Sequence, residues 1–77
     1  MNPTFSHRIY DRMLQLYEVI NIWWTLHGYA PTVRDLERAT GLTHNKTVRG
    51  LRRLRALGLV TWAEGRARTI RVTNGRT

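Results

Sequence analysis

Three glycines divide this chain into segments of helical length, and they constrain its fold more than any other feature. Gly28, Gly41 and Gly58 each follow a run in which apolar residues recur at three- and four-residue steps. That spacing is the period of an amphipathic helix, and glycine is the residue that most often ends one. Beyond Gly58, apolar residues recur at the two-residue step of a strand. We therefore expect three helices followed by β structure.

The first predicted helix is long and the second is short. Residues 6–27 form one amphipathic helix. The second helix, over residues 32–40, opens with Thr32 and Asp35 at capping-box spacing. It has about two turns, so it must dock against the other elements to be stable. The third helix runs over residues 43–57, with a threonine as its cap.

The end of the chain reads as a hairpin. Residues 59–63 and 68–73 are predicted strands, joined by a turn at residues 64–67. Three helices and a C-terminal two-stranded wing make a winged helix-turn-helix, a mainly α fold with a small β-hairpin. The fold class alone does not establish a function.

The length of the chain allows one small domain. We expect a single domain over residues 1–77, with frayed ends at 1–5 and 74–77. The chain has no Cys, and its three His residues lack metal-ligand spacing, so neither a disulfide nor a metal is expected. No cofactor motif is present, and no apolar run is long enough to span a bilayer.

The net charge is concentrated in the second half of the chain. Residues 1–42 balance four Arg against four acids, whereas residues 43–77 carry nine basic residues against Glu64 alone. The second half therefore holds the whole net charge of +8, which suits a polyanionic partner. All the basic residues except Lys46 are Arg, which favours bidentate contacts with phosphate and guanine. A G·C-rich genome would explain part of the Arg bias, but it would not explain the clustering.

The third helix is predicted to place this charge on one face. With Leu51 at the centre of the inward face, a rotation of about 100° per residue points Lys46, Arg49 and Arg53 outward. A helix that is basic outside and apolar inside suits the major groove of duplex DNA. Residues near the start of such a helix usually reach the bases. We therefore expect Asn45, Lys46 and Arg49 to read bases.

The other polar residues near this helix are expected to hold the DNA backbone. They are Thr43, His44, Arg52, Arg53 and Arg55, together with Thr32 at the start of the second helix. On the hairpin, Arg66, Arg68 and Arg71 are expected to clamp phosphates or to enter a minor groove. The tryptophans are interpreted as core residues, and Trp62 as a core or hairpin-stacking residue.

Two features allow more than one interpretation. Gly50 lies inside the third helix, where glycine is unfavourable. One interpretation is that it permits a close approach of the backbone to DNA or to another helix. The other is that the helix simply tolerates it. A second apolar stripe on the first helix, formed by Val19, Ile22 and Leu26, either packs beneath the other elements or forms a homodimer interface. A single winged helix makes few base contacts, so recognition of paired half-sites favours the dimer.

One part of the sequence resembles a known family. The run Gly28-Tyr29-Ala30-Pro31-Thr32, followed by Gly41-Leu42 and Gly58-Leu59-Val60, is similar to the N-terminal DNA-binding domain of LexA-type repressors. The resemblance covers roughly residues 16–72. Val48 and Leu51 fall seven and ten positions after Gly41, which is similar to the slightly longer turn of that family.

The resemblance implies sequence-specific binding of double-stranded DNA by a regulator, with repression as the expected activity. It also implies a cytoplasmic, nucleoid-associated location in a bacterial or phage-infected cell. The self-cleaving serine/lysine domain that dimerises LexA proteins is not carried over to this sequence. We therefore expect a stand-alone regulator of the phage or mobile-element kind, or an excised domain of a longer protein.

Catalysis finds little support in the sequence. Ser6 is the only Ser and Lys46 the only Lys, they fall in different elements, and no phosphate loop or paired-carboxylate motif is present. We therefore expect that the protein is not an enzyme. Its expected partners are double-stranded DNA and a second copy of itself. No membrane is expected as a partner. The alternatives are a protein-interaction module, such as an anti-repressor or polymerase-binding factor, and a non-specific or RNA-binding protein.

Overall fold

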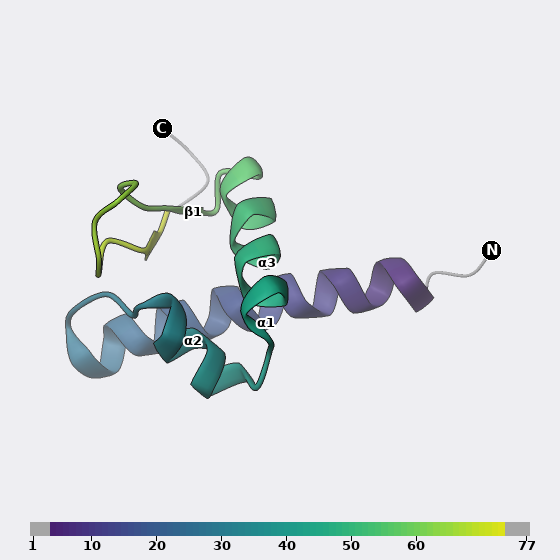
Figure 1. The fold of residues 1–77 in the computed structure, drawn as a ribbon, viewed down its shortest axis with the longest axis horizontal. Coiled ribbons are helices and arrows are strands. Elements are labelled where there is room, and N and C mark those ends of the chain that lie inside the picture. Colours follow the sequence, from purple (N-terminus) through teal and green to yellow (C-terminus); the bar gives the residue numbers. More distant parts are fainter. Residues whose placement is uncertain (1–3, 74–77) are drawn as a thin grey trace.

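The computed structural model describes residues 4–73 (Figure 1). The elements follow in the order α1 (Thr4–His27), α2 (Val33–Thr40), α3 (His44–Ala56), β1 (Val60–Thr61) and β2 (Arg71–Val72). The two strands pair antiparallel, with Val60 opposite Val72 and Thr61 opposite Arg71. This is the predicted winged helix-turn-helix. The ends at residues 1–3 and 74–77, which were expected to fray, lie outside the described residues.

N-capping hydrogen bonds begin the two shorter helices where the sequence predicts. Thr32 Oγ1 accepts a hydrogen bond from Asp35 N at 3.0 Å, and Asp35 Oδ2 accepts one from Thr32 N at 3.0 Å, which completes the capping box of α2. Thr43 Oγ1 caps α3 by accepting from Lys46 N at 3.2 Å. Helix α1 begins earlier than expected and includes residues 4–5, since extending a formed helix costs far less than starting one.

The core lies where α1 meets the other elements. Its buried members come from every helix and from the hairpin region. They are Met13, Leu16, Ile20, Leu36, Leu51, Leu54, Val60 and Ile70. Thr47 of α3 is buried with them, and its hydroxyl donates to Thr43 O at 2.8 Å. The buried hydroxyl therefore carries no unpaired donor.

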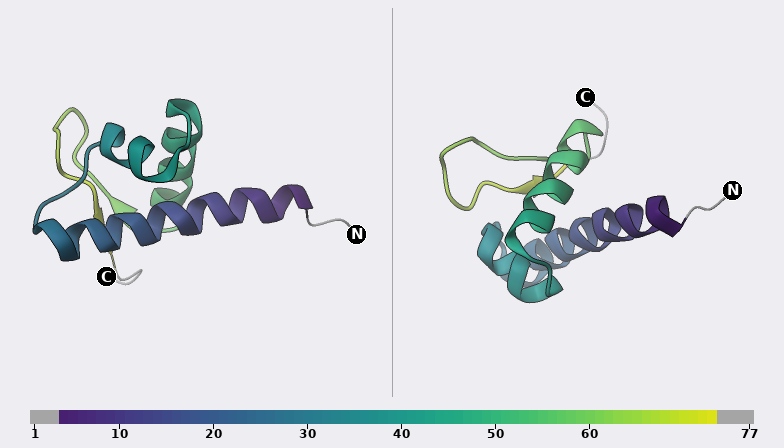
Figure 2. Two further views of the ribbon diagram at one scale, coloured as in Figure 1. Left: turned by 90° about the horizontal axis from the view of Figure 1, so that it is seen from below. Right: turned by 45° about the vertical axis from the view of Figure 1, so that its right-hand side comes forward.

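Helix α3 crosses close to α1 (Figure 2). Gly50 lies at this contact. A Cβ atom built at Gly50 would overlap Cδ1 of Leu16, and the Leu16 side chain is itself fully buried. Of the interpretations proposed for this glycine, the structure therefore supports close approach to another helix. Removing the side chain at this one position lets the two helices pack at short range.

The hairpin has shorter strands than the sequence predicts. The expected strands at residues 59–63 and 68–73 are reduced to two residues each. Arg68 adopts a left-handed backbone conformation with φ of 58°, which interrupts the second strand. The hydroxyl of Thr69 accepts from Ala63 N at 2.9 Å, the amide that ends the first predicted strand. The wing is therefore mostly a structured loop.

Two absences hold for the described part of the chain. No helix over residues 4–73 is long and apolar enough to cross a membrane. Among the side chains of residues 10–73, no group of three or more His, Asp or Glu is arranged to hold a metal ion.

Candidate nucleic-acid interface

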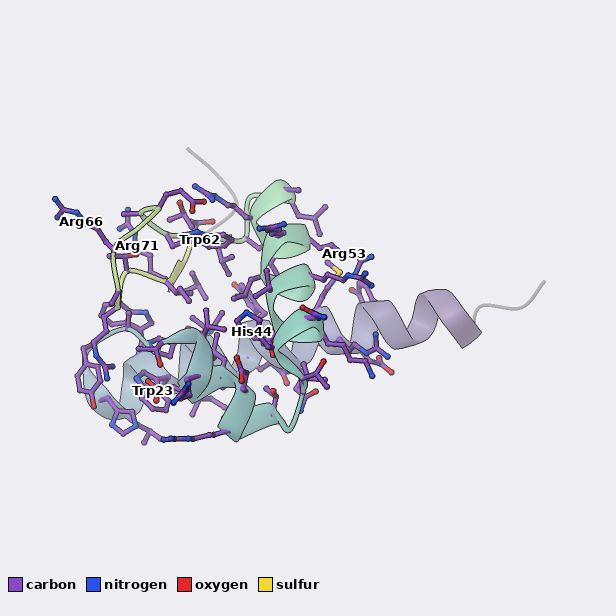
Figure 3. All side chains as sticks on the ribbon, viewed as in Figure 1. Trp23, His44, Arg53, Trp62, Arg66 and Arg71 are labelled. Carbon is purple, nitrogen blue, oxygen red and sulfur yellow. The ribbon has the colours of Figure 1, made fainter. Side chains whose placement is uncertain are left out.

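The outward face of α3 is exposed and positively charged. Asn45, Lys46, Arg49 and Arg53 are all solvent-exposed, on the side of the helix opposite the buried Leu51. Within the described part of the chain, none of these four side chains forms a hydrogen bond or an ion pair. Figure 3 shows Arg53 on the side of α3 away from the wing. The face is therefore free to bind a ligand.

Three of the predicted backbone-contacting residues already take part in contacts at the ends of helices. Thr32 and Thr43 use their hydroxyl oxygens as acceptors for helix caps, which leaves each O–H able to donate. His44 Nδ1 lies 2.8 Å from Glu37 Oε2, which links the start of α3 to α2. Arg52, in contrast, is exposed and forms no ion pair among residues 4–73.

Arg55 is directed toward the wing. Its Nη1 donates to Glu64 Oε2 at 2.6 Å, its Nη2 donates to Trp62 O at 3.3 Å, and its guanidinium lies 4.3 Å from the centre of the Trp62 ring. Trp62 Nε1 also donates to Glu64 Oε2, at 3.2 Å. The hydrogen bond from Arg55 lowers the pKa of the Glu64 carboxyl. We call these three residues the Arg55 cluster.

Arg68 is directed toward the turn between α1 and α2. Its Nη1 donates to Ala30 O at 3.1 Å and lies 3.5 Å from Asp35 Oδ2, and its guanidinium lies 5.0 Å from the centre of the Tyr29 ring. The pKa of Asp35 is lowered, mainly by the hydrogen bond from Thr32 N and further by the charge of Arg68. Sequence reasoning missed these partners of Arg68, since they lie more than 30 residues away along the chain.

The other two predicted wing residues are free. Arg66 and Arg71 are exposed and form no ion pair within residues 4–73. Figure 3 shows Arg66 pointing from the wing away from the rest of the molecule. Of the three arginines assigned to the wing, these two are therefore available to a ligand.

A groove of about 430 Å³ separates the wing from the helices. One wall is formed by Val48 and Arg52 of α3, and the start of α2 contributes Pro31 and Val33. The loop of the wing between its two strands, residues 62–70, forms the opposite wall. The width of the groove therefore depends on where the wing is held.

Trp24 and Trp62 pack against the core as the sequence predicts, whereas the prediction of a core position is wrong for Trp23, which packs against His27 and Tyr29. Trp24 is half-buried against the core, and its Nε1 donates to Ile70 O at 2.9 Å, which joins α1 to the return side of the wing. Trp62 is also half-buried against the core. Trp23 lies with its ring centre 4.3 Å from that of His27, and its buried Nε1 has no hydrogen-bond partner among the described residues.

The second apolar stripe of α1 is only partly exposed. Ile22 is 56% and Leu26 72% exposed, whereas Val19 is half-buried and packs against the core. Val19 belongs to the core packing because it lies at the edge of the buried face of α1. The exposed part of the predicted stripe is therefore smaller than the sequence suggests.

A helix-turn-helix with an unpaired basic face on its last helix, next to a two-stranded wing, defines a winged-helix DNA-binding domain. The chain belongs to the LexA DNA-binding domain family, whose model matches residues 7–69. This result confirms the resemblance inferred from the sequence.

Two relatives show how much of the chain is shared. The chain is 42% identical over 62 residues to LexA repressor 1 of Nocardia farcinica, a match that covers 79% of this chain and 29% of the relative. It is 41% identical over 71 residues to the LexA repressor of Lacticaseibacillus casei, covering 90% of this chain and 32% of the relative. The chain thus spans about a third of the length of these proteins.

Proposed function

We propose that this protein is a sequence-specific transcriptional repressor that acts by occupying an operator in double-stranded DNA. The observation that carries the proposal is the outward face of α3, where exposed basic side chains lack any partner among residues 4–73. Membership in a DNA-binding family supports the same partner, and the relatives named as LexA repressors support repression.

In this proposal α3 lies in the major groove. Asn45 suits adenine, and Lys46 and Arg49 suit guanine, because their side chains match the donors and acceptors that these bases present there. All three lie in the first half of α3, the part that usually reaches the bases. The surrounding residues that would hold phosphates are Thr32, Thr43, His44, Arg52 and Arg53.

The wing would contact the DNA backbone or an adjacent minor groove through Arg66 and Arg71. Their exposure and their lack of an ion pair in the described structure support this role. A second copy of the protein would occupy the adjoining half-site. The exposed Ile22 and Leu26 are the proposed contacts between the two copies.

A gel-shift assay with DNA from upstream of the protein's own gene tests this function. A shift that survives excess random DNA at the higher of two salt concentrations is the expected result, because specific contacts depend less on salt than phosphate contacts do. Equal competition by random DNA would contradict sequence specificity. No shift at all would contradict DNA binding and would favour a protein-interaction module.

A further inference from the structure

The wing is held by side chains rather than by its own strands. Its two strands have two residues each, and an isolated two-stranded hairpin is at best marginally stable in water. Besides the packing against the core and the hydrogen bond from Trp24 to Ile70 O, two arginines tie the wing to the helices. The Arg55 cluster joins the wing to α3, and Arg68 joins it to the turn between α1 and α2.

Arg68 is held in place from three directions. A backbone carbonyl, a carboxylate and an aromatic ring surround its guanidinium, contributed by Ala30, Asp35 and Tyr29. Its left-handed backbone, uncommon for a residue other than glycine, accompanies this inward orientation. The side chain is still half exposed, but its Nη1 group is directed to Ala30 O and Asp35 Oδ2 and not toward solvent.

The Arg55 cluster holds the wing against α3. Glu64 is the only acid among residues 43–77, and it accepts hydrogen bonds from both Arg55 and Trp62. An acid at this place would repel a DNA phosphate, so its position on the wing is better explained by the arginine that it binds. Arg52, three residues earlier on α3, is exposed and has no such partner within residues 4–73.

These contacts determine the geometry of the groove. Arg52 lies on its α3 wall and Arg66 on its wing wall, and both lack an ion pair in the described residues. With the wing held in place, the backbone positions of Arg52 and Arg66 on the two walls are fixed relative to each other, while their side chains remain exposed. If the wing were loose, binding would first have to order it, and this would cost conformational entropy.

We propose that Arg55 and Arg68 are positioning residues that hold the wing for DNA binding and do not themselves contact phosphate. The proposal rests on the proposed function, and it divides the basic residues of the second half into two groups. Arg52 and Arg66 contact the backbone, whereas Arg55 and Arg68 act through the position of the wing, which carries Arg66 and Arg71.

Two matched pairs of variants test the proposal, each removing one positive charge. On α3, Arg55→Gln is compared with Arg52→Gln, and both keep a good helix former. On the wing, Arg68→Asn is compared with Arg66→Asn, because Asn tolerates the left-handed backbone of Arg68. Circular dichroism first checks that each variant is folded. Affinity for DNA is then measured across a range of salt concentrations.

The slope of log affinity against log salt separates the two roles. Loss of a phosphate contact reduces the steepness of this slope by about 0.9, which we expect for Arg52→Gln and Arg66→Asn. Arg55→Gln and Arg68→Asn should weaken binding about tenfold, the cost of ordering about one more residue, with the slope unchanged. A shallower slope for Arg55→Gln or Arg68→Asn would overturn the proposal.

A combined variant gives an independent readout. If Arg68 acts only through the DNA contacts of the wing, Arg68→Asn should have no further effect on affinity once Arg66→Asn and Arg71→Asn have removed those contacts. Additive losses would overturn the proposal, since they would show that Arg68 contributes a contact of its own.

The contact of Arg55 with the wing is also tested without DNA. In an NMR spectrum of the free protein, Trp62→Phe identifies the indole N–H signal of Trp62. Arg55→Gln should shift that signal, and Arg52→Gln should leave it in place. An unmoved signal in Arg55→Gln would overturn the role of Arg55 in holding the wing. This result is independent of DNA, so failure of the wild-type protein to bind DNA would count against the proposed function alone.

Discussion

The carboxylate of Asp35 joins the start of α2 to the wing, because one oxygen, Oδ2, accepts from Thr32 N at 3.0 Å and lies 3.5 Å from Arg68 Nη1. The same carboxylate therefore caps a helix and neutralises an arginine of the wing. The ion pair requires the deprotonated form and the hydrogen bond from Thr32 N favours it, so both lower the pKa of Asp35 below its ordinary value of 3.8, with the hydrogen bond contributing most.

This lowered pKa predicts an acid-dependent loss of stability. The contribution of Asp35 is complete above its unfolded pKa and disappears as the pH falls below about 3.8 and through the lowered folded value. Asp35→Asn keeps an acceptor for the helix cap but removes the charge. Urea unfolding at neutral pH and at pH values below 4 should show a difference between Asp35→Asn and wild type that shrinks in acid. A difference independent of pH would contradict the assignment.

Gly50→Ala is expected to destabilise the protein, although alanine is the better helix former. The substitution gains up to about 1 kcal/mol of helix propensity. It also forces a methyl group against the buried Leu16, and such overpacking costs about 1–3 kcal/mol. Urea unfolding measures the net loss, and Leu16→Val in the same chain should recover part of it. An increase in stability of about 1 kcal/mol would show that the two helices move apart freely.

The two neighbouring tryptophans provide a controlled test of one hydrogen bond. Trp24→Phe removes the donor to Ile70 O, whereas Trp23→Phe removes an Nε1 that has no partner among the described residues. Trp24→Phe should therefore cost about 1 kcal/mol more stability than Trp23→Phe. Thermal unfolding of both variants provides the comparison, and equal losses would argue against a contribution from this bond.

Arg49 and Arg53 are expected to differ in what they recognise. Arg49→Ala should lose about 1–3 kcal/mol of binding to the operator and relax the preference at one base pair. Arg53→Ala should weaken binding to all DNA alike and make the salt dependence less steep. Binding to the operator, to single-base variants of it and to random DNA distinguishes them. Equal losses on operator and random DNA for Arg49→Ala would exclude base reading by that residue.

The proposed contact between two copies is tested by Leu26→Asp. Sedimentation of the wild-type protein should show a dimer that this charge disrupts. Leu57→Asp is the control, since Leu57 is also exposed, at 61%, but lies at the end of α3. A wild-type protein that sediments as a monomer, unaffected by Leu26→Asp, would rule out an interface at this position.

The parts of the fold that depend on short-range chemistry were predictable from the sequence. The caps at Thr32 and Thr43 each involve a side chain and a backbone amide three residues apart, so residue type and spacing suffice to recognise them. The inward and outward faces of α3 follow from helical rotation in the same way.

The directions of the arginine side chains were not predictable. Charge counts give the sign of a surface but do not show which guanidinium binds within the protein. Arg55 meets Glu64 nine residues away, and Arg68 meets Ala30 at a separation of 38 residues. The strand ends were misplaced for a related reason, because the left-handed conformation of Arg68 and the hydroxyl of Thr69 depend on how the wing closes.

The close packing of Gly50 on Leu16 has a consequence for the evolution of this domain. It fixes the side of α3 that faces α1, whereas the side chains of Asn45, Lys46 and Arg49 form no hydrogen bond or ion pair among the described residues. Substitution of these three side chains by other good helix formers should therefore cost little folding stability. If they read bases as proposed, a lineage carrying this scaffold can acquire a new target sequence through a few substitutions, because the residues that fold α3 and those that read DNA lie on different sides of it.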